Sequence, residues 1–258
     1  MSFVDNENVF RTVRETRTCP SWRNNATCGG RRPTDYPPLQ KRFDEAGLVL
    51  LRGVKSQLHL LDIAGVLGTV FRHPHAAPDG LTHVKAAHQW DSADAEARNE
   101  VGLTSSALTP HTDRSGMDRP PNVLGFWIEH QSAIGGSSTF VNGAKLIEEL
   151  SVEDPQAVRA LTRPKSVAFK SEAGLSEGQI VSFTDKGLLL RFRYDKMVYM
   201  APDVAGVLPL LNRLMTRLAE RFSLNDGEGY IVNNHSWLHG RTHFHGCRSA
   251  YRVLACRG

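Results

Sequence analysis

The segment Thr109-Pro110-His111-Thr112-Asp113-Arg114-Ser115 carries a histidine and an aspartate separated by one residue. Side chains alternate along an extended chain, so His111 and Asp113 would point the same way if this segment is a strand. One imidazole and one carboxylate can take two neighbouring positions on a divalent metal, but a third ligand must come from elsewhere. The best candidate is His239, in the segment Asn234-His235-Ser236-Trp237-Leu238-His239-Gly240-Arg241. Two histidines and one carboxylate on one face, with the opposite face open, suit oxygen-activating non-haem Fe(II).

The composition around this segment is that of a globular protein with one large domain. The chain has 258 residues, a length at which an all-β barrel or sandwich commonly forms a single domain. Hydrophobic residues make up 40% and charged residues 22%, which is the ordinary balance for a protein with a packed core. The formal net charge of +4 is scattered, without the dense Lys/Arg block typical of nucleic-acid or membrane binding. A site for an anionic small molecule would account for part of the excess.

Cysteine usage and hydropathy indicate the compartment. Cys19, Cys28, Cys247 and Cys256 form no Cys-x-x-Cys pair, and we expect four structural thiols rather than a disulfide or a zinc site. The N-terminus lacks the charged start and apolar core of a secretory signal. No run reaches the roughly 18 apolar residues of a membrane span. We therefore expect a cytoplasmic protein with reduced thiols.

The chain reads as a polar arm followed by one domain. Residues 1–35 are polar and lack apolar periodicity, which predicts an N-terminal arm, and residues 36–258 are expected to form a single domain. Many short strands with a few helices predict a mainly β fold in which two sheets form the core and helices flank it. The predicted helices are 39–46, 58–71, 144–150, 158–161 and 207–222, and the predicted strands are 48–51, 122–129, 137–141, 167–169, 180–183, 188–192, 229–233 and 250–256. Residues 72–80 are predicted to form a loop, and residues 88–108 a largely irregular segment.

Several segments together resemble a known family, the Fe(II)- and 2-oxoglutarate-dependent dioxygenases of the taurine dioxygenase and clavaminate synthase superfamily. The resemblance runs from about residue 110 to 255. It implies a double-stranded β-helix (jelly-roll) core, with Fe(II), 2-oxoglutarate and O₂ as the requirements of the reaction. The matching residues are His111-Thr112-Asp113-Arg114-Ser115, Arg119-Pro120-Pro121, Gly135-Gly136-Ser137-Ser138-Thr139-Phe140-Val141, Asn234, His239-Gly240-Arg241, Phe244 and Arg252-Val253-Leu254.

The resemblance also implies roles for single residues at the iron. It makes His111, Asp113 and His239 the iron ligands and therefore the catalytic residues. Related halogenases lack the carboxylate and bind chloride in its place, so the presence of Asp113 favours hydroxylation. The implied reaction couples oxidative decarboxylation of 2-oxoglutarate to succinate and CO₂ with hydroxylation of an unactivated C–H bond.

The co-substrate needs a cation of its own. Its distal carboxylate must be met inside the protein, and arginine matches a carboxylate in bidentate fashion. The resemblance places this arginine shortly after the last histidine ligand, and we expect it to be Arg252, with Arg248 as the alternative. Thr139 matches a family threonine whose hydroxyl contacts the same carboxylate. Some relatives carry a further arginine at the position of Cys256, and that contact is not available here.

Candidate substrate contacts come from weaker matches. His73 precedes Pro74 where the taurine branch has a substrate-facing histidine, although a solvated loop histidine is the plainer interpretation. Asp195, in Arg193-Tyr194-Asp195, resembles an aspartate that binds cationic side chains in amino-acid hydroxylases, or is simply the end of a surface strand. Leu108 and Ser115 flank the metal motif and would line the pocket. We expect the substrate to be a small metabolite, an amino acid or a derivative of one, in specialised metabolism such as antibiotic biosynthesis.

Other interpretations of these residues stay open. The same cofactors support desaturation or ring formation, and the same triad would serve a non-catalytic metal-binding jelly roll or a metallo-hydrolase. A hydrolase would have no need of Arg252 and Thr139 together. The histidines near His239, namely His235, His243 and His245, are expected to support the site or lie on the surface. Trp127 and Trp237 are expected in the core.

Overall fold

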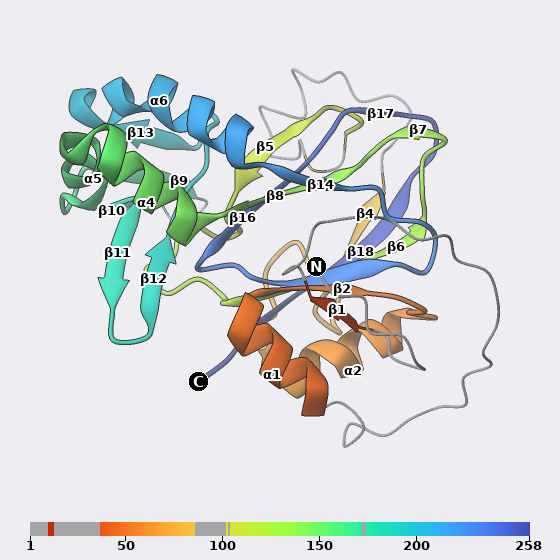
Figure 1. Ribbon diagram of the computed structural model, residues 1–258. Coiled ribbons are helices and arrows are strands. Elements are labelled where there is room, and N and C mark those ends of the chain that lie inside the picture. The colour runs from red at the N-terminus through yellow and green to blue at the C-terminus, as the bar shows by residue number, and fades with distance from the viewer. Residues whose placement is uncertain (1–9, 13–36, 86–101, 103, 172–173) are drawn as a thin grey trace.

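Two antiparallel sheets face each other across an apolar interior, with helices on their outer sides (Figure 1). The computed structural model describes residues 10–12, 37–85, 102, 104–171 and 174–258. Most of the predicted arm, Cys19, Cys28 and most of the segment 88–108 therefore lie outside the described residues. The expected mainly β fold with flanking helices is confirmed.

The larger sheet has seven strands, and we call it the major sheet. Its order is β1-β2-β15-β6-β18-β3, with β4 also paired to β18. Apolar residues dominate its central strands because both faces of these strands are covered. The strands are β1 (Phe10–Thr12), β2 (Leu48–Leu51), β15 (Gly229–Asn233), β6 (Val123–His130), β18 (Ser249–Cys256), β3 (Thr69–Val70) and β4 (Leu81–Lys85).

The minor sheet has four strands in the order β14-β8-β16-β5. These are β14 (Glu220–Phe222), β8 (Ser138–Asn142), β16 (Trp237–Arg241) and β5 (Leu108–His111). A separate pair, β7 (Ile134–Gly135) with β17 (Phe244–His245), continues the pairing of β8 with β16 beyond the ends of those strands. Phe140 of β8 meets Tyr230 of β15 edge-on, with ring centroids 4.7 Å apart. This contact joins the facing surfaces of the two sheets.

Two helices cover the outer face of the major sheet. They are α1 (Pro37–Ala46) and α2 (Gln57–Leu67), and Ser56 caps α2 by accepting a hydrogen bond from the backbone N–H of His59 at 3.2 Å. Leu60 and Ile63 of α2 pack in one buried cluster with Trp127 and Val253 of the sheet. The apolar stripe of α2 therefore holds the sheet from outside.

A second helical layer covers the minor sheet. It consists of α4 (Gly143–Glu153), α5 (Pro155–Thr162) and α6 (Pro202–Leu218), which gather at one end of the molecule (Figure 1). Val141 and Leu238 of the sheet pack into this layer. Small sheets complete it: β10 (Gly174–Gly178), β9 (Val167–Ser171) and β13 (Val198–Met200), and the hairpin of β11 (Val181–Thr184) and β12 (Gly187–Leu190).

Two helices were predicted to continue beyond the residues at which they end. The helix predicted at 58–71 ends at Leu67, because Gly68 packs against the end of β18: a Cβ on it would lie 2.5 Å from the Cys256 carbonyl oxygen. Thr69 and Val70 then form β3. The helix predicted at 207–222 is α6, which begins at Pro202 and ends at Leu218, and the next residues form β14 beside β8.

Strands were missed where the sequence does not alternate plainly. The strands β4, β10, β13 and β16 were not predicted, and Leu108, expected to end an irregular segment, begins β5. The strands predicted at 48–51 and 229–233 match β2 and β15, and the other predicted helices and strands are present with shifted ends. Trp127 and Trp237 are buried as expected. No helix in the described part of the chain has the length and apolarity needed to cross a membrane.

Gly240 sets the distance between two strands of the minor sheet. A Cβ at this position would lie 2.5 Å from the Leu108 carbonyl oxygen and 2.8 Å from Thr139 Oγ1. Only a residue without a side chain allows β16 to approach β5 and β8 this closely. His239 is the neighbour of Gly240, so this close approach also brings β16 and its histidine toward β5.

Candidate metal centre and its cavity

A cavity of about 600 Å³ opens between the two sheets. Cross-strand partners point to the same face of a sheet, which explains which side chains reach it. On the major sheet Tyr230, Phe126, Arg252 and Thr82 are successive partners across β15, β6, β18 and β4, and all line the cavity. The minor sheet supplies the opposite wall.

His111, Asp113 and His239 come together at this wall. Their ligand atoms all lie within 4.8 Å of one another, and within the described ranges no other group of three or more His, Cys, Asp or Glu side chains does so. His239 of β16 is the cross-strand partner of His111 of β5, and their ring centroids are 4.6 Å apart. His111 Nε2 lies 3.7 Å from Asp113 Oδ1. The sequence predicted these three residues as a metal triad.

The segment that carries Asp113 is only partly extended. The strand β5 ends at His111, and Asp113 begins a turn in which Arg114 adopts a left-handed φ of 57°. Thr112 keeps the chain extended between them, because its N–H donates to the Phe192 carbonyl at 2.8 Å and its Oγ1 accepts from the Phe192 N–H at 3.0 Å. The strand therefore ends before Asp113, and the turn that follows still brings the Asp113 carboxylate next to His111.

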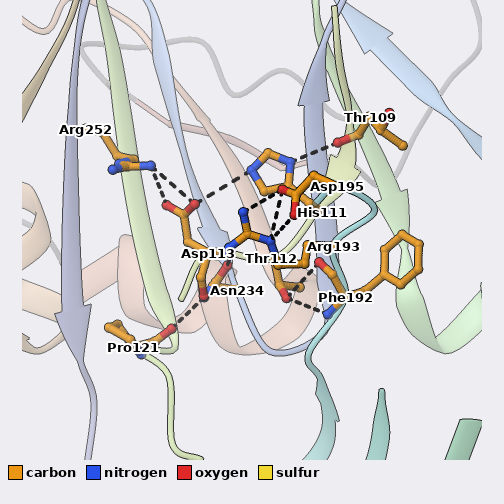
Figure 2. A network of polar contacts seen from close by, with 10 residues as sticks. All are labelled: Thr109, His111, Thr112, Asp113, Pro121, Phe192, Arg193, Asp195, Asn234 and Arg252. Carbon is orange, nitrogen blue, oxygen red and sulfur yellow. Dashed lines mark hydrogen bonds and ion pairs between the residues drawn. The ribbon is translucent and has the colours of Figure 1, made fainter. Parts of the chain in front are cut away.

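Asn234 holds the backbone of Asp113. Its Oδ1 accepts from the Asp113 N–H at 2.7 Å, and its Nδ2 donates to the carbonyl oxygens of Asp113 at 2.9 Å and Pro121 at 2.8 Å (Figure 2). Asn234 is fully buried, so these bonds are not exchanged with water. The carboxylate of Asp113 thus projects from a main chain fixed on both sides.

The hydrogen bonds of the imidazoles leave nitrogen atoms for a metal. His111 Nδ1 lies 2.9 Å from the Thr109 carbonyl oxygen, an acceptor only, so Nδ1 carries the proton and Nε2 keeps its lone pair. The buried Nδ1 of His239 has no hydrogen-bond partner in the described part of the chain. Neutral imidazole nitrogens beside a carboxylate are the donor set that suits non-haem Fe(II).

Electrostatics favours the protonation states that a metal requires. Burial alone would raise the pKa of Asp113, but Arg252, His111 and His239 outweigh it and hold that pKa well below its usual range. Burial, assisted by the charges of His111 and Arg252, lowers the pKa of His239 to about 3. Asp113 is therefore ionised and His239 neutral at physiological pH, as metal ligands must be. The residues fit a divalent metal.

Arg252 and Arg248 both line the cavity, at different places. Arg252 Nη1 lies 3.2 Å from Asp113 Oδ1 and 3.0 Å from Oδ2, so this arginine is next to the metal triad (Figure 2). Arg248 is 3% exposed, lies over the rings of Phe126 and Phe244, and donates to Gln131 Oε1 at 3.1 Å. Arg248 therefore has a neutral amide as its partner.

A third arginine joins this part of the cavity. Arg241 of β16 lies over Phe244 at 4.6 Å and donates through Nη2 to the carbonyl oxygens of Thr104 and Ser106. Burial and the nearby charge of Arg248 lower the pKa of Arg241 to about 9, and burial lowers that of Arg248 to about 10. No carboxylate of the described residues pairs with either one. Arg241 belongs to the segment that resembles the family, but the resemblance implied no role for it.

The predicted hydroxyl at Thr139 is not part of the cavity wall, whereas Ser138 is. The pairing of β8 with β16 explains this, because Phe140 is the partner of His239 and Ser138 is the partner of Arg241. Thr139 is opposite Gly240 and faces the helical layer with Val141. Ser138 is a residue that sequence reasoning missed, and only the strand register separates it from Thr139.

Two of the predicted substrate residues lie behind the wall. His73 is buried, and its Nε2 lies 3.1 Å from Oγ1 of Thr82, which does line the cavity. Burial, with Arg114 and Arg252 nearby, lowers the pKa of His73 to about 4. Ser115 is buried outside the wall, and its carbonyl oxygen accepts from Arg191 Nε at 2.8 Å.

The other two predicted substrate residues reach the cavity. Leu108 lies on the wall at the start of β5, and Asp195 lies on it as well. Arg193 Nε donates to both oxygens of Asp195, at 2.8 and 3.0 Å, and the Met197 N–H donates to Oδ1 at 2.9 Å. The charge of Asp195 is therefore shared with an arginine of the same segment.

The remaining histidines and cysteines near β16 do not join the triad. His235 Nε2 lies 2.7 Å from the Pro120 carbonyl oxygen, which places it beneath the loop that follows Asp113. His243 and His245 are exposed, with their Nε2 atoms 3.3 Å apart. Cys247 and Cys256 are exposed thiols.

Comparison with known families gives one match over most of the chain. The model of the family described as "Taurine catabolism dioxygenase TauD, TfdA family" matches residues 31–254. Among curated relatives, gamma-butyrobetaine dioxygenase of Homo sapiens and that of Pongo abelii are each 24% identical over 171 residues. Each alignment covers 60% of this chain and 44% of the relative, so the chain spans less than half the length of these relatives.

Solved structures share the fold at low sequence identity. Asparagine oxygenase in complex with Fe(II), 2S,3S-3-hydroxyasparagine and succinate is 16% identical, with a TM-score of 0.69 over 87% of this chain and 78% of that one. The non-heme iron oxygenase OrfP in complex with Fe and alpha-ketoglutaric acid is 14% identical, with a TM-score of 0.65 over 87% and 79% of the two chains. At these identities the likeness concerns the fold.

Proposed function

The chain belongs to the TauD, TfdA family, and on that premise we propose that it is an Fe(II)- and 2-oxoglutarate-dependent dioxygenase that hydroxylates an unactivated C–H bond of a small metabolite. One observation carries the proposal. The triad His111, Asp113 and His239 faces a cavity that is also lined by Arg241 and Arg248, two buried arginines that pair with no carboxylate of the described residues. A metal site and an anion site in one cavity suit a co-substrate that binds a metal and carries a second carboxylate.

The metal would be held by His111, Asp113 and His239, which we propose as the catalytic residues. Iron, when bound, supplies the oxidative chemistry that consumes O₂ and the 2-oxo acid. The protein's own contribution is position and environment. Asn234 and Phe192 fix the main chain at residues 112 and 113, and the Thr109 carbonyl orients the His111 ring.

The distal carboxylate of 2-oxoglutarate would be bound by an arginine, and the geometry supports Arg248 more strongly than Arg252. The keto acid group binds the metal, and the distal carboxylate lies three carbon–carbon bonds beyond the keto carbon. Arg252 touches Asp113 itself, which is too close to the metal for that distance. Arg248 is deeper among Phe126 and Phe244 and has no carboxylate partner in the described residues. Ser138 lines the cavity and Thr139 does not, so Ser138 is better placed to donate a hydroxyl hydrogen bond to the same carboxylate.

We propose an amino acid or amino acid derivative as the substrate, in specialised metabolism such as antibiotic biosynthesis. The relatives and structural neighbours are named for butyrobetaine or asparagine, or were solved with hydroxylated asparagine or arginine. Leu108 and Asp195 line the cavity and would contact it directly, and His73 would act through Thr82. Ser115 would act by holding the turn after Asp113 through its carbonyl bond to Arg191.

The domain organisation is a part of this proposal. We propose that residues 36–258 act as one catalytic domain and that residues 1–35 are an extension of it. Within this extension, β1 pairs with β2 at the edge of the major sheet, with Phe10 opposite Leu51. The small molecules bound in the cavity are the proposed partners of the domain.

Anaerobic addition of Fe(II) and then 2-oxoglutarate tests the proposed function. We expect the weak visible charge-transfer band of an iron-bound 2-oxo acid, and no band when either component is omitted. Candidate amino acids are then screened for substrate-dependent succinate formation in air. A protein that binds Fe(II) but gives no band and no binding of 2-oxoglutarate would be a metal-binding jelly roll of another kind.

A further inference from the structure

Tyr230 is a buried tyrosine of the cavity wall that none of the steps above uses. It lies on β15 with 3% of its surface exposed, in a strand whose other residues are apolar or small up to Asn233. Its ring stacks on Phe126, with centroids 5.3 Å apart, and meets Phe140 edge-on at 4.7 Å. These two contacts, one from each sheet, fix the direction of the ring.

The hydroxyl of this ring has no hydrogen-bond partner among the described residues, although Tyr230 lines the cavity. A buried tyrosine hydroxyl normally finds a partner, because an unpaired buried polar group costs free energy. A polar group that is left open toward a cavity is one that a ligand can satisfy.

Its charged neighbours indicate which ligand group that is. Tyr230 interacts electrostatically with Asp113 and with Arg248, Arg252 and Arg241, and Arg248 is the strongest of the three arginines. Arg248 and Tyr230 both contact the ring of Phe126. Burial, followed by the charge of Asp113, raises the pKa of the Tyr230 hydroxyl, so the hydroxyl stays protonated and acts as a donor. A donor beside guanidinium groups suits a carboxylate, which accepts several hydrogen bonds at once.

We propose that Tyr230 donates a hydrogen bond to the distal carboxylate of the 2-oxo acid, beside Arg248 and Ser138. This assignment rests on the proposed function. It adds a neutral hydrogen-bond donor, the Tyr230 hydroxyl, to the ion pair between Arg248 and the distal carboxylate. Tyr230 lies on the major sheet and Ser138 on the minor sheet, so a carboxylate held by both bridges the two walls of the cavity.

The variant Tyr230→Phe tests this assignment, because it removes the hydroxyl and keeps the ring and its contacts. Anaerobic titration of the Fe(II)-loaded protein gives the Kd for 2-oxoglutarate and for 2-oxovalerate, which has the same carbon chain without the distal carboxylate. We expect Y230F to weaken 2-oxoglutarate binding roughly tenfold and to leave 2-oxovalerate and Fe(II) binding within about twofold.

Tyr251→Phe is the matched control. Tyr251 is also largely buried, at 8% exposed, but it faces the helix side of the major sheet and stacks on Trp127 and His83. We expect Y251F to leave the affinity for both acids unchanged. The ratio of the two affinities therefore separates a contact with the distal carboxylate from a general loss of stability.

Two results would overturn the assignment: unchanged 2-oxoglutarate affinity in Y230F, or equal weakening of both acids. Failure of the proposed function looks different, because then the wild-type protein itself binds no 2-oxoglutarate. If the wild-type protein binds 2-oxoglutarate and Y230F binds it equally well, only the role assigned to Tyr230 is refuted.

Discussion

The two ends of the cavity have opposite electrostatic arrangements. At the metal end the carboxylate of Asp113 is paired with Arg252, and its main chain is held by Asn234. At the anchor end, among the residues that the structure describes, Arg241 and Arg248 form hydrogen bonds only with backbone carbonyls and a side-chain amide. Buried charge without a counter-charge is unfavourable, and burial lowers the pKa of both arginines. The metal end is thus organised by the protein itself, whereas in the proposed function the anchor end would be completed by the carboxylate of a bound anion.

The largest effect is expected from breaking the metal end at Asp113. Asp113→Ala removes the one carboxylate of the triad and should abolish both Fe(II) binding and hydroxylation. Equilibrium dialysis with Fe(II) under anaerobic conditions measures the first, and succinate formation the second. Asp195→Asn is the control for the Fe(II) measurement alone, because it neutralises a carboxylate of the same cavity that pairs with Arg193 and is not part of the triad. Undiminished hydroxylation in Asp113→Ala would contradict the ligand assignment.

The second effect separates the two arginines. Arg248→Ala should weaken 2-oxoglutarate binding roughly a hundredfold, since loss of one partner of a buried charge pair costs about 3 kcal/mol. Arg252→Ala should weaken 2-oxoglutarate binding less than Arg248→Ala does, and it should remove the ion pair of Asp113. The Kd of the Fe(II)-loaded protein for 2-oxoglutarate checks both. A large effect of Arg252→Ala with none of Arg248→Ala would restore Arg252, the residue that the sequence favours, as the anchor.

The smallest effect is expected behind the metal end, at Asn234. Asn234→Ala removes three hydrogen bonds that hold Asp113 and Pro121 without touching a ligand atom, and should weaken Fe(II) binding roughly tenfold. Asn234→Asp keeps the acceptor for the Asp113 N–H and loses both donors, so an intermediate loss is expected. Metal titration followed by thermal denaturation distinguishes a displaced ligand from a destabilised fold. An affinity equal to that of the wild type in both variants would show that the turn needs no such support.

The metal triad was predictable because its ligands carry chemistry in their residue types and lie in short motifs. The co-substrate residues were harder, because they depend on register. Ser138 and Thr139 are adjacent hydroxyl residues, and only the pairing of β8 with β16 decides which one faces the cavity. The strand β16 was itself not predicted, so this choice could not be made from the sequence.

Helix ends show the same dependence on tertiary contacts. The apolar pattern continues beyond Leu67, but β3 pairs with the end of β18, with Val70 opposite Ala255. No pattern within residues 58–71 reveals that partner, which lies at the other end of the chain. In contrast, the strand predicted at 229–233 matches β15 from end to end, because its apolar run stands between clear turn residues.

The close packing of Gly240 has a consequence for the choice of metal. Gly240 sets the distance between β16 and β5. The spacing of the His111 and His239 imidazoles is therefore determined by backbone packing and does not depend on a bound ion. Divalent ions of similar size would then meet the same three donors, and selection among them would fall to ligand preference and supply. Cobalt(II) or manganese(II) should therefore bind at the site without a change in the position of its ligands. Either ion would serve as a spectroscopic probe that does not react with oxygen as iron does.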